Sequence, residues 1–379
     1  MAVYDFDSEI DRRKSSSLKW DYYKQRDVIP LWVADMDFKA SGQVISALKN
    51  RVDHGVFGYT LPPDELMDTL VTMLKTRYAW DVAPSWIVPL PGVVSGLNVS
   101  CRAVGKPGDS VMVPVPVYPP FFDAPALAGK EMVRVEMVQR KNRLTFDWDS
   151  LENKIDSNTC LFLLCSPHNP GGTVFRESEL RNLAAMAKTH RLVICSDEIH
   201  CGLVLEGRHI PTAVACPDIR DQVITLMAPS KTYNIPGLGF SFAIISDNPL
   251  REAFIRAKKG VVPEVNALGY TAALAAYRDS DTWLSEVLDY LRINRDLTYK
   301  RLSQCRGLSL IRPESTYLIW IDARGTRLDD PALFFEKAGV GLSDGKYFGA
   351  PGFLRLNFGC SRLLLTRALD RMERALSHL

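Results

Sequence analysis

Short apolar runs alternate with longer amphipathic segments through the middle of the chain. Runs such as 159–165 (TCLFLLC) and 222–227 (QVITLM) are apolar at successive positions, which is typical of strands buried on both faces. Between them, segment 177–190 (ESELRNLAAMAKTH) repeats its apolar residues at helical spacing. This alternation predicts a mostly parallel sheet covered by helices. The expected strands are 109–115, 159–165, 191–197, 222–227 and 239–246, and the expected helices lie near 93–104, 177–190 and 249–258.

The pattern changes after about residue 264. From there a long helical stretch, a strand–turn–strand pattern, a short helix, a strand and a last amphipathic helix follow one another. This order predicts a smaller α+β domain, on which we expect the N-terminal arm to pack. The predicted fold class is α/β, with a large domain over 45–275 and a small domain formed by 1–44 and 276–379. The later elements are expected at 264–304, 308–325, 330–338, 352–359 and 361–378.

Composition and charge narrow the classes of partner. The chain has 379 residues, of which 46% are hydrophobic and 24% are charged, and its formal net charge is +2. This balance predicts neither a nucleic-acid-binding surface nor a membrane-binding face. Because no apolar run reaches 18 residues and the first segment is charged (MAVYDFDSEIDRRK), we expect a cytoplasmic protein.

The cysteine and histidine patterns do not predict a metal site. Eight cysteines are scattered without a CxxC pair, and the six histidines form no HExxH motif. Several of the cysteines lie in apolar runs, where a buried reduced thiol is the ordinary state. We therefore expect free thiols and no metal centre.

Three polar side chains follow three of the predicted strands. Asn169 lies in the turn SPHNPGG, Asp197 ends the strand RLVICSD, and Lys231 follows QVITLM. Each alone fits a structural role: a turn residue, a helix cap and a solvated loop lysine, respectively. Because the carboxyl ends of parallel strands open onto one edge of a sheet, we expect the three to converge there. An amide, a carboxylate and a lysine around one pocket match pyridoxal phosphate, whose aldehyde, ring nitrogen and phenolic oxygen require these groups.

The strings that carry these residues resemble a known family. SPHNPGG, DEIH (197–200) and PSKTYNIPGL (229–238) are similar to those of the fold-type I pyridoxal-phosphate enzymes. Within that group they resemble the MalY/PatB-type cystathionine β-lyases, which are carbon–sulfur lyases related to the class I and II aminotransferases. The resemblance covers nearly the whole chain. It includes LWVADMDF (31–38), HGVFGYT (54–60), PGVVSGL (91–97), PVYPPF (116–121), PESTYLIWID (313–322) and FLRLNFGCSR (353–362).

The resemblance implies roles at the cofactor. Lys231 would carry pyridoxal phosphate as an imine and move the substrate α-proton, and Asp197 would pair with the protonated ring nitrogen. Tyr118 would stack on the ring and belongs with these two in the catalytic set, while Asn169 would donate to the phenolic oxygen. His200 would lie beside the cofactor. At the phosphate, the donors would be the amides of Val93 and Val94 at a helix N-terminus and the hydroxyl of Ser230.

The resemblance also implies a substrate site and a second subunit. Arg355 is similar to the arginine that binds the substrate α-carboxylate through two parallel donors, although a lone strand arginine is more often structural. Trp32 and Asp35 would line the mouth of the site. Tyr59 resembles a tyrosine that reaches the phosphate and substrate from the neighbouring subunit, which implies a homodimer with shared active sites. The chain departs from related aminotransferases at Gly239, eight residues after the lysine, where they often carry Arg or Lys.

These features predict an enzyme that acts on a small amino acid. The expected reaction is α,β-elimination from cystathionine or another cysteine S-conjugate to pyruvate, ammonia and a thiol. No residue separates this reaction from transamination on physical grounds, so an aminotransferase is the alternative. A non-catalytic regulator that binds the same cofactor is a third reading, which the near-neutral charge does not favour.

Overall fold

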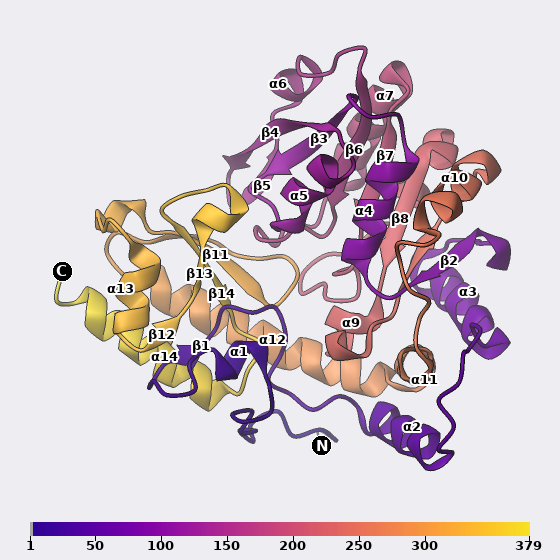
Figure 1. The fold of residues 1–379 in the computed structure, drawn as a ribbon. Coiled ribbons are helices and arrows are strands. Elements are labelled where there is room, and N and C mark those ends of the chain that lie inside the picture. Colours follow the sequence, from indigo (N-terminus) through magenta and orange to yellow (C-terminus); the bar gives the residue numbers. More distant parts are fainter. Residues whose placement is uncertain (1–2) are drawn as a thin grey trace.

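The structure, a computed structural model, describes residues 3–379 and contains two main sheets that lie side by side, together with a separate two-stranded pair (Figure 1). The larger sheet has eight strands in the order β2-β9-β8-β7-β6-β3-β4-β5. Strands β8, β7, β6, β3 and β4 are parallel, whereas β2–β9, β9–β8 and β4–β5 are antiparallel pairs. The strands are β2 (Ile87–Leu90), β3 (Ser110–Val115), β4 (Glu131–Arg140), β5 (Arg143–Phe146), β6 (Thr159–Cys165), β7 (Val193–Asp197), β8 (Val223–Met227) and β9 (Ser241–Ile244).

The central strands are apolar on both faces because helices cover both faces. Along β6, Leu161 and Leu163 pack into a core with α4, while Phe162 and Leu164 pack into a second core with α7. Successive side chains of a strand point to opposite faces, so an unbroken apolar run is what a sheet between two helical layers requires. The helices of this part are α3 (Asp64–Tyr78), α4 (Val93–Ala103), α5 (Pro120–Leu127), α6 (Trp148–Glu152), α7 (Glu177–His190), α8 (Thr212–Ala215), α9 (Pro229–Thr232), α10 (Asn248–Lys258) and α11 (Ala267–Asp279), with short 3₁₀ turns at Pro84–Trp86, Pro217–Gln222 and Pro236–Leu238.

The smaller sheet is antiparallel, in the order β10-β11-β14-β13. The N-terminal arm pairs with the C-terminal part of the chain in a separate two-stranded sheet, in which β1 (Ile29–Pro30) is parallel to β12 (Val340–Gly341). Figure 1 shows α12 running beneath both sheets. The remaining elements are α1 (Leu18–Asp21), α2 (Gly42–Asp53), β10 (Ser309–Ile311), β11 (Leu318–Asp322), β13 (Ser343–Asp344), β14 (Phe353–Asn357), α12 (Asp281–Leu302), α13 (Pro331–Lys337) and α14 (Arg362–Leu376), with 3₁₀ turns at Arg324–Thr326 and Gly345–Phe348.

The predicted fold class is confirmed, with two differences in detail. The helical stretch 264–304 divides at Ser280 into α11 and α12, because α11 packs on α2 whereas α12 packs on α14. The sequence pattern did not predict strands β2, β4 and β5, which lie at or next to the edges of the large sheet. The domain boundaries stay a prediction, which the pairing of β1 with β12 supports.

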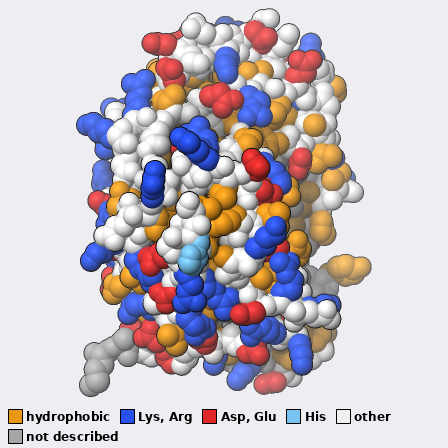
Figure 2. Space-filling view, turned by 90° about the vertical axis from the view of Figure 1, so that its left-hand side faces the viewer, with side chains coloured by type: hydrophobic (Ala, Val, Ile, Leu, Met, Phe, Trp, Pro, Cys, Tyr) orange, Lys and Arg blue, Asp and Glu red, His pale blue; other side chains and the backbone are white. Residues whose placement is uncertain are grey.

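The surface carries no large area of one charge on the face that Figure 2 shows, where basic and acidic side chains are interspersed and hydrophobic ones gather toward the middle. None of the helices within residues 3–379 has the length and apolar character that crossing a bilayer requires.

A buried ionic network fixes the N-terminal arm. The side chain of Lys19 is fully buried, and its Nζ donates to Asp37 Oδ2 at 2.8 Å. Arg12 donates to Asp37 Oδ1 and to Asp35 Oδ2, both at 2.6 Å. We call Arg12, Lys19, Asp35 and Asp37 the arm cluster. Burial by itself would raise the pKa of Asp37, but Lys19 and the donors beside it hold that pKa below its ordinary value. Buried charges are stable only when they are paired in this way.

Candidate active site

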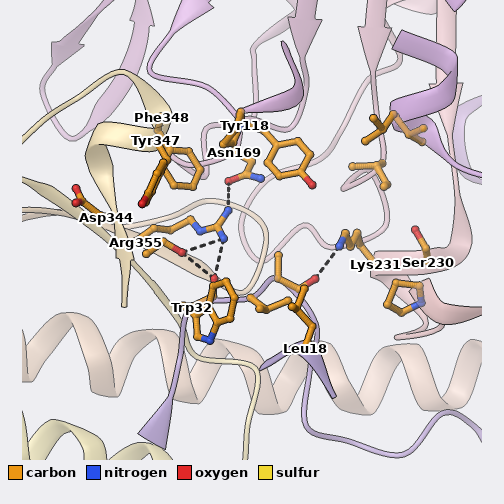
Figure 3. Close-up of a pocket in the computed structure, with 18 of the residues that line it drawn as sticks. Leu18, Trp32, Tyr118, Asn169, Ser230, Lys231, Asp344, Tyr347, Phe348 and Arg355 are labelled. Atoms are coloured by element: carbon orange, nitrogen blue, oxygen red, sulfur yellow. Dashed lines mark hydrogen bonds between the residues drawn. The ribbon is translucent and has the colours of Figure 1, made fainter. Parts of the chain in front are cut away.

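A cavity of about 810 Å³ lies at the carboxyl ends of β6, β7 and β8, between the two sheets. Its lining comes from the turns after these strands, from the start of α4 and from the small sheet (Figure 3). Strands β6, β7 and β8 are neighbours, with Cys165 opposite Asp197 and Asp197 opposite Leu226. The expected convergence of Asn169, Asp197 and Lys231 on one edge is therefore what the strand order produces, and all three line the cavity.

Asp197 is buried in this cavity and Lys231 is partly buried, and both have unusual proton affinities. Burial raises the pKa of Asp197 to about 7, although the amide of Ile199 donates to its Oδ1 at 3.0 Å. Burial lowers the pKa of Lys231 to about 8, against the opposing effect of two carboxylates, Asp35 and Asp197. The Lys231 Nζ donates to the backbone carbonyl of Ala34 at 2.7 Å. A carboxylate held out of water without an ion-pair partner, beside a lysine of reduced pKa, is typical of a catalytic site.

Arg355 lies on the opposite wall, where Figure 3 shows it beside Asn169 and Trp32. Its Nη1 donates to Asn169 Oδ1 at 3.0 Å, and its Nη2 donates to the Trp32 carbonyl at 2.8 Å. The guanidinium carbon lies 4.7 Å from the centre of the Phe348 ring. Burial lowers the pKa of Arg355 to about 10, and within residues 3–379 no carboxylate forms an ion pair with it. A buried cation without a counter-ion favours an anionic ligand.

Tyr118 stands between these groups. It lines the cavity, and Figure 3 shows its ring close to Asn169 and facing the space before Lys231. Burial raises the pKa of its hydroxyl, so the side chain is neutral at physiological pH. The tyrosine therefore offers an uncharged aromatic face to a ligand in the cavity.

The start of α4 forms the far end of the cavity. Gly92 is the N-cap of this helix and provides no side-chain hydrogen bond to it, so the amides of Val93 and Val94 are available to a ligand. Both residues and Ser230 line the cavity. Gly239 lines it as well, at a φ of +64° that disfavours other residues. Helix amides and a hydroxyl are the donors that bind a phosphate at such an end.

His200 and Trp32 also line the cavity, as predicted. Burial lowers the pKa of His200 to about 3, which keeps the ring neutral, and its buried Nδ1 has no hydrogen-bond partner within the described residues. The indole of Trp32 packs beside the exposed ring of Tyr22 at 5.3 Å between centroids. Trp32 thus belongs to the mouth of the cavity.

Two predicted residues lie elsewhere. Asp35 was expected at the mouth, but this placement is wrong: the carboxylate is turned into the arm cluster because Arg12 holds it at 2.6 Å. Tyr59 does not line the cavity of its own chain. It is fully exposed, at 112% of the reference value, in a stretch without regular secondary structure. A role toward a neighbouring subunit stays a prediction.

Sequence reasoning missed several residues of the site. Tyr317 is fully buried, and its hydroxyl donates to the Ala34 carbonyl oxygen at 2.8 Å. The same oxygen accepts the hydrogen bond from Lys231 Nζ. Ser343 bonds both the Trp32 carbonyl and Arg355. No spacing signals these contacts, because the residues are brought together by the small sheet and not by a local motif.

The chemistry of the cavity fits pyridoxal phosphate. Asp197 lacks a cation, the helix start offers amides to an anion, and Arg355 and His200 keep buried polar nitrogens, Nε and Nδ1, without partners in the described chain. A phosphate, a protonated ring nitrogen and an amino-acid carboxylate are the groups that such donors and such a carboxylate bind. The donor set therefore matches the cofactor predicted from the sequence.

Comparison with known proteins agrees with this geometry. The family model described as aminotransferase class I and II matches residues 26–372. Cystathionine β-lyase PatB of Bacillus subtilis is 36% identical, over 98% of this chain and 100% of its own. The solved structure of OvoB is 48% identical with a TM-score of 0.97, and the match covers 99% of each chain. Cystalysin of Treponema denticola, whose crystal structure contains pyridoxal 5′-phosphate, is 33% identical with a TM-score of 0.95 over 99% of each chain.

These likenesses extend over nearly the full length of each protein, so they include both sheets and the cavity between them. The chain therefore belongs to the aminotransferase class I and II family, in the group that contains the PatB-type cystathionine β-lyases.

Proposed function

We propose that this protein is a pyridoxal-phosphate-dependent lyase that cleaves the Cβ–S bond of an L-cysteine S-conjugate such as cystathionine, releasing pyruvate, ammonia and a thiol. The observation that carries the proposal is that buried Asp197 and partly buried Lys231 share one cavity with an unpaired arginine, Arg355. The similarity to PatB and to cystalysin supports the choice of reaction.

Different residues of the cavity would bind different parts of the cofactor. The amides of Val93 and Val94 and the hydroxyl of Ser230 would hold the phosphate, and Asp197 would pair with the ring nitrogen. Without the cofactor, the pKa of Asp197 is about 7. A cation beside it would offset the cost of burying its charge, so the carboxylate would stay ionised when the cofactor is bound. Tyr118 would lie against the ring. When bound, pyridoxal phosphate supplies an electron sink that stabilises negative charge at the substrate α-carbon.

Lys231 and Arg355 would act on the substrate. Arg355 would bind the α-carboxylate through its two parallel donors and so fix the orientation of the α-carbon. The amine of Lys231 would remove the α-proton, and a base with a pKa of about 8 is partly unprotonated near neutral pH. The phenol of Tyr118 and the imidazole of His200 are both neutral, so they add no charge that competes for the proton.

Elimination is tested directly by the products. Purified protein supplied with pyridoxal phosphate should release pyruvate from L-cystathionine without an added keto acid, as measured by a coupled lactate dehydrogenase assay. Lys231→Ala should abolish this release, because no other amine lines that wall of the cavity in residues 3–379. Turnover that appears only when an amino-acceptor keto acid is present would show an aminotransferase instead. Cofactor binding without any turnover would show a regulator.

The proton affinity of Lys231 predicts the pH dependence of cofactor capture. Its amine must be unprotonated to attack an aldehyde, and burial lowers its pKa to about 8. The rate at which cofactor-free protein takes up pyridoxal phosphate should therefore rise as the pH increases through about 8 and then level off. Stopped-flow measurement of the visible absorbance gives this rate. A rate that keeps rising toward the ordinary lysine value of 10.5 would contradict the assignment.

Arg355→Ala should weaken substrate binding and leave cofactor binding unchanged. Removing one partner of a buried charge pair costs about 2–5 kcal/mol, so kcat/KM should fall by roughly 30-fold or more, mostly through KM. Steady-state kinetics together with absorbance of bound cofactor measure both effects. Lys346→Ala is the matched control, since Lys346 lines the same cavity but is paired with Asp344 at 2.8 Å. Loss of cofactor with unchanged KM would contradict this role.

We also propose that the active unit is a homodimer in which Tyr59 serves the cavity of the other subunit. Its support is the full exposure of Tyr59 within a segment that exposes further apolar side chains. Exposed apolar side chains grouped in one segment are typical of a surface that another chain covers. The exposed residues of this segment are Val56, Phe57, Tyr59 and Leu61.

Mixed dimers test this proposal. Tyr59→Phe should weaken cofactor binding by roughly tenfold, the loss expected for one hydrogen bond to a charged group. Dimers formed from Tyr59→Phe subunits and Lys231→Ala subunits should regain native affinity at one site, because the native tyrosine of one subunit meets the native lysine of the other. Equilibrium titration of cofactor absorbance measures the affinity. Absence of this recovery, or a monomer in analytical ultracentrifugation, would contradict the shared site.

A further inference from the structure

The backbone carbonyls of residues 32–36 form a continuous row of acceptors between the two halves of the site. Every one of the five accepts from a side-chain donor, and the donors include Lys231 from α9, which follows the large sheet, and Arg355 from β14 of the small sheet, as Figure 3 shows. A loop so fully bonded has little freedom to move. The bonds are Arg355 and Ser343 to Trp32, Asn357 to Val33 and Asp35, Lys231 and Tyr317 to Ala34, Lys19 to Asp35, and Asn234 and Arg12 to Met36, at 2.6–3.4 Å.

The Ala34 carbonyl is the acceptor for the reactive lysine, and its position depends on the next residue. Asp35 Oδ2 accepts from Arg12 at 2.6 Å, and Lys19 Nζ lies 3.7 Å from Asp35 Oδ1. That Oδ1 is buried and has no hydrogen-bond partner in the described chain. The arm cluster therefore clamps the peptide unit on one side of Ala34, while Tyr317 holds the carbonyl oxygen on the other.

Asp35 also supplies charge. The groups that face the Lys231 amine are Asp35 and Asp197, which favour its protonated form, and Arg355, which disfavours it. Asp35 has the largest effect of the three, and it opposes the dominant effect of burial. Its carboxylate thus acts on the lysine through both the backbone and the electrostatic field, although it does not line the cavity.

We propose that Asp35, anchored by Arg12, is a positioning residue for Lys231: it fixes the Ala34 carbonyl that receives the lysine amine and supplies the negative charge that balances that amine. This inference rests on the proposed function for the identity of the reactive lysine. It assigns the polar residues of the LWVADMDF segment to the lysine rather than to the substrate.

The test measures the Lys231 amine in cofactor-free protein. Reductive methylation with isotope-labelled formaldehyde, quantified on the Lys231 peptide by mass spectrometry across a pH series, gives the pKa of this one amine. Asp35→Asn keeps the size of the side chain and removes its charge. It should lower the pKa of Lys231 by about one pH unit, since a nearby opposite charge shifts a pKa by roughly 1–3 units. At pH 7 the labelling rate should then rise roughly fivefold.

Arg12→Gln is the second variant and has the opposite expected sign. It keeps the Asp35 carboxylate but removes a neutralising cation, so the pKa of Lys231 should rise and labelling at pH 7 should slow. Opposite shifts distinguish charge from loosening, because a site that merely opened to water would raise the pKa in both variants. Glu179→Gln is the matched control: it breaks a similarly part-buried pair with Arg143, outside the cavity lining, and should leave the labelling unchanged.

The outcomes separate this proposal from the proposed function. An unchanged or raised Lys231 pKa in folded Asp35→Asn protein overturns the positioning role, as does an equal shift in Glu179→Gln. If Asp35→Asn does not fold, judged by its thermal unfolding curve, Arg12→Gln is compared with Arg12→Lys, which keeps the positive charge. A Lys231 pKa that rises in Arg12→Gln and not in Arg12→Lys supports the proposal, and any other pattern overturns it. Failure of the proposed function appears differently, as native protein that takes up no pyridoxal phosphate or releases no pyruvate.

Discussion

Burial of the Lys231 amine is the interaction on which the rest of the site depends. A lysine placed at the end of a central strand, under two domains, loses most of its hydration, and its pKa falls to about 8. The structure tolerates this loss because the amine has one good acceptor, the Ala34 carbonyl, and two carboxylates that favour its charge. The same burial that weakens the proton affinity makes the amine useful as a base and as a nucleophile.

The remaining features of the site can be understood as compensation for further buried charge. Asp197 and Arg355 are buried on facing walls without ion-pair partners of their own in the described chain. Their sites are complementary to a ligand that carries a cation at one place and a carboxylate at another. Ligand binding would replace the lost hydration, so the free energy spent on burying these groups is recovered as affinity and orientation.

The N-terminal arm is as important to this arrangement as the large sheet. Its arm cluster is itself a set of paired buried charges, and it holds the loop whose carbonyls receive Lys231 and Arg355. The two halves of the site are therefore held at a fixed separation by a segment that belongs to neither sheet. The segment LWVADMDF (31–38), near the start of the chain, therefore has a structural role in the site.

The sequence by itself determined the strand–helix alternation, the parallel sheet and the positions of Asn169, Asp197 and Lys231, because these depend on local periodicity and on the rule that strand ends share one edge. The sequence also indicated the family, because several short motifs occur in the order that is typical of it. It did not determine that Asp35 turns away from the cavity toward Arg12, that Tyr317 shares an acceptor with Lys231, or that Ser280 divides a helical stretch. Those outcomes depend on contacts between residues that are far apart in the chain, and only the tertiary structure decides which buried charge finds which partner.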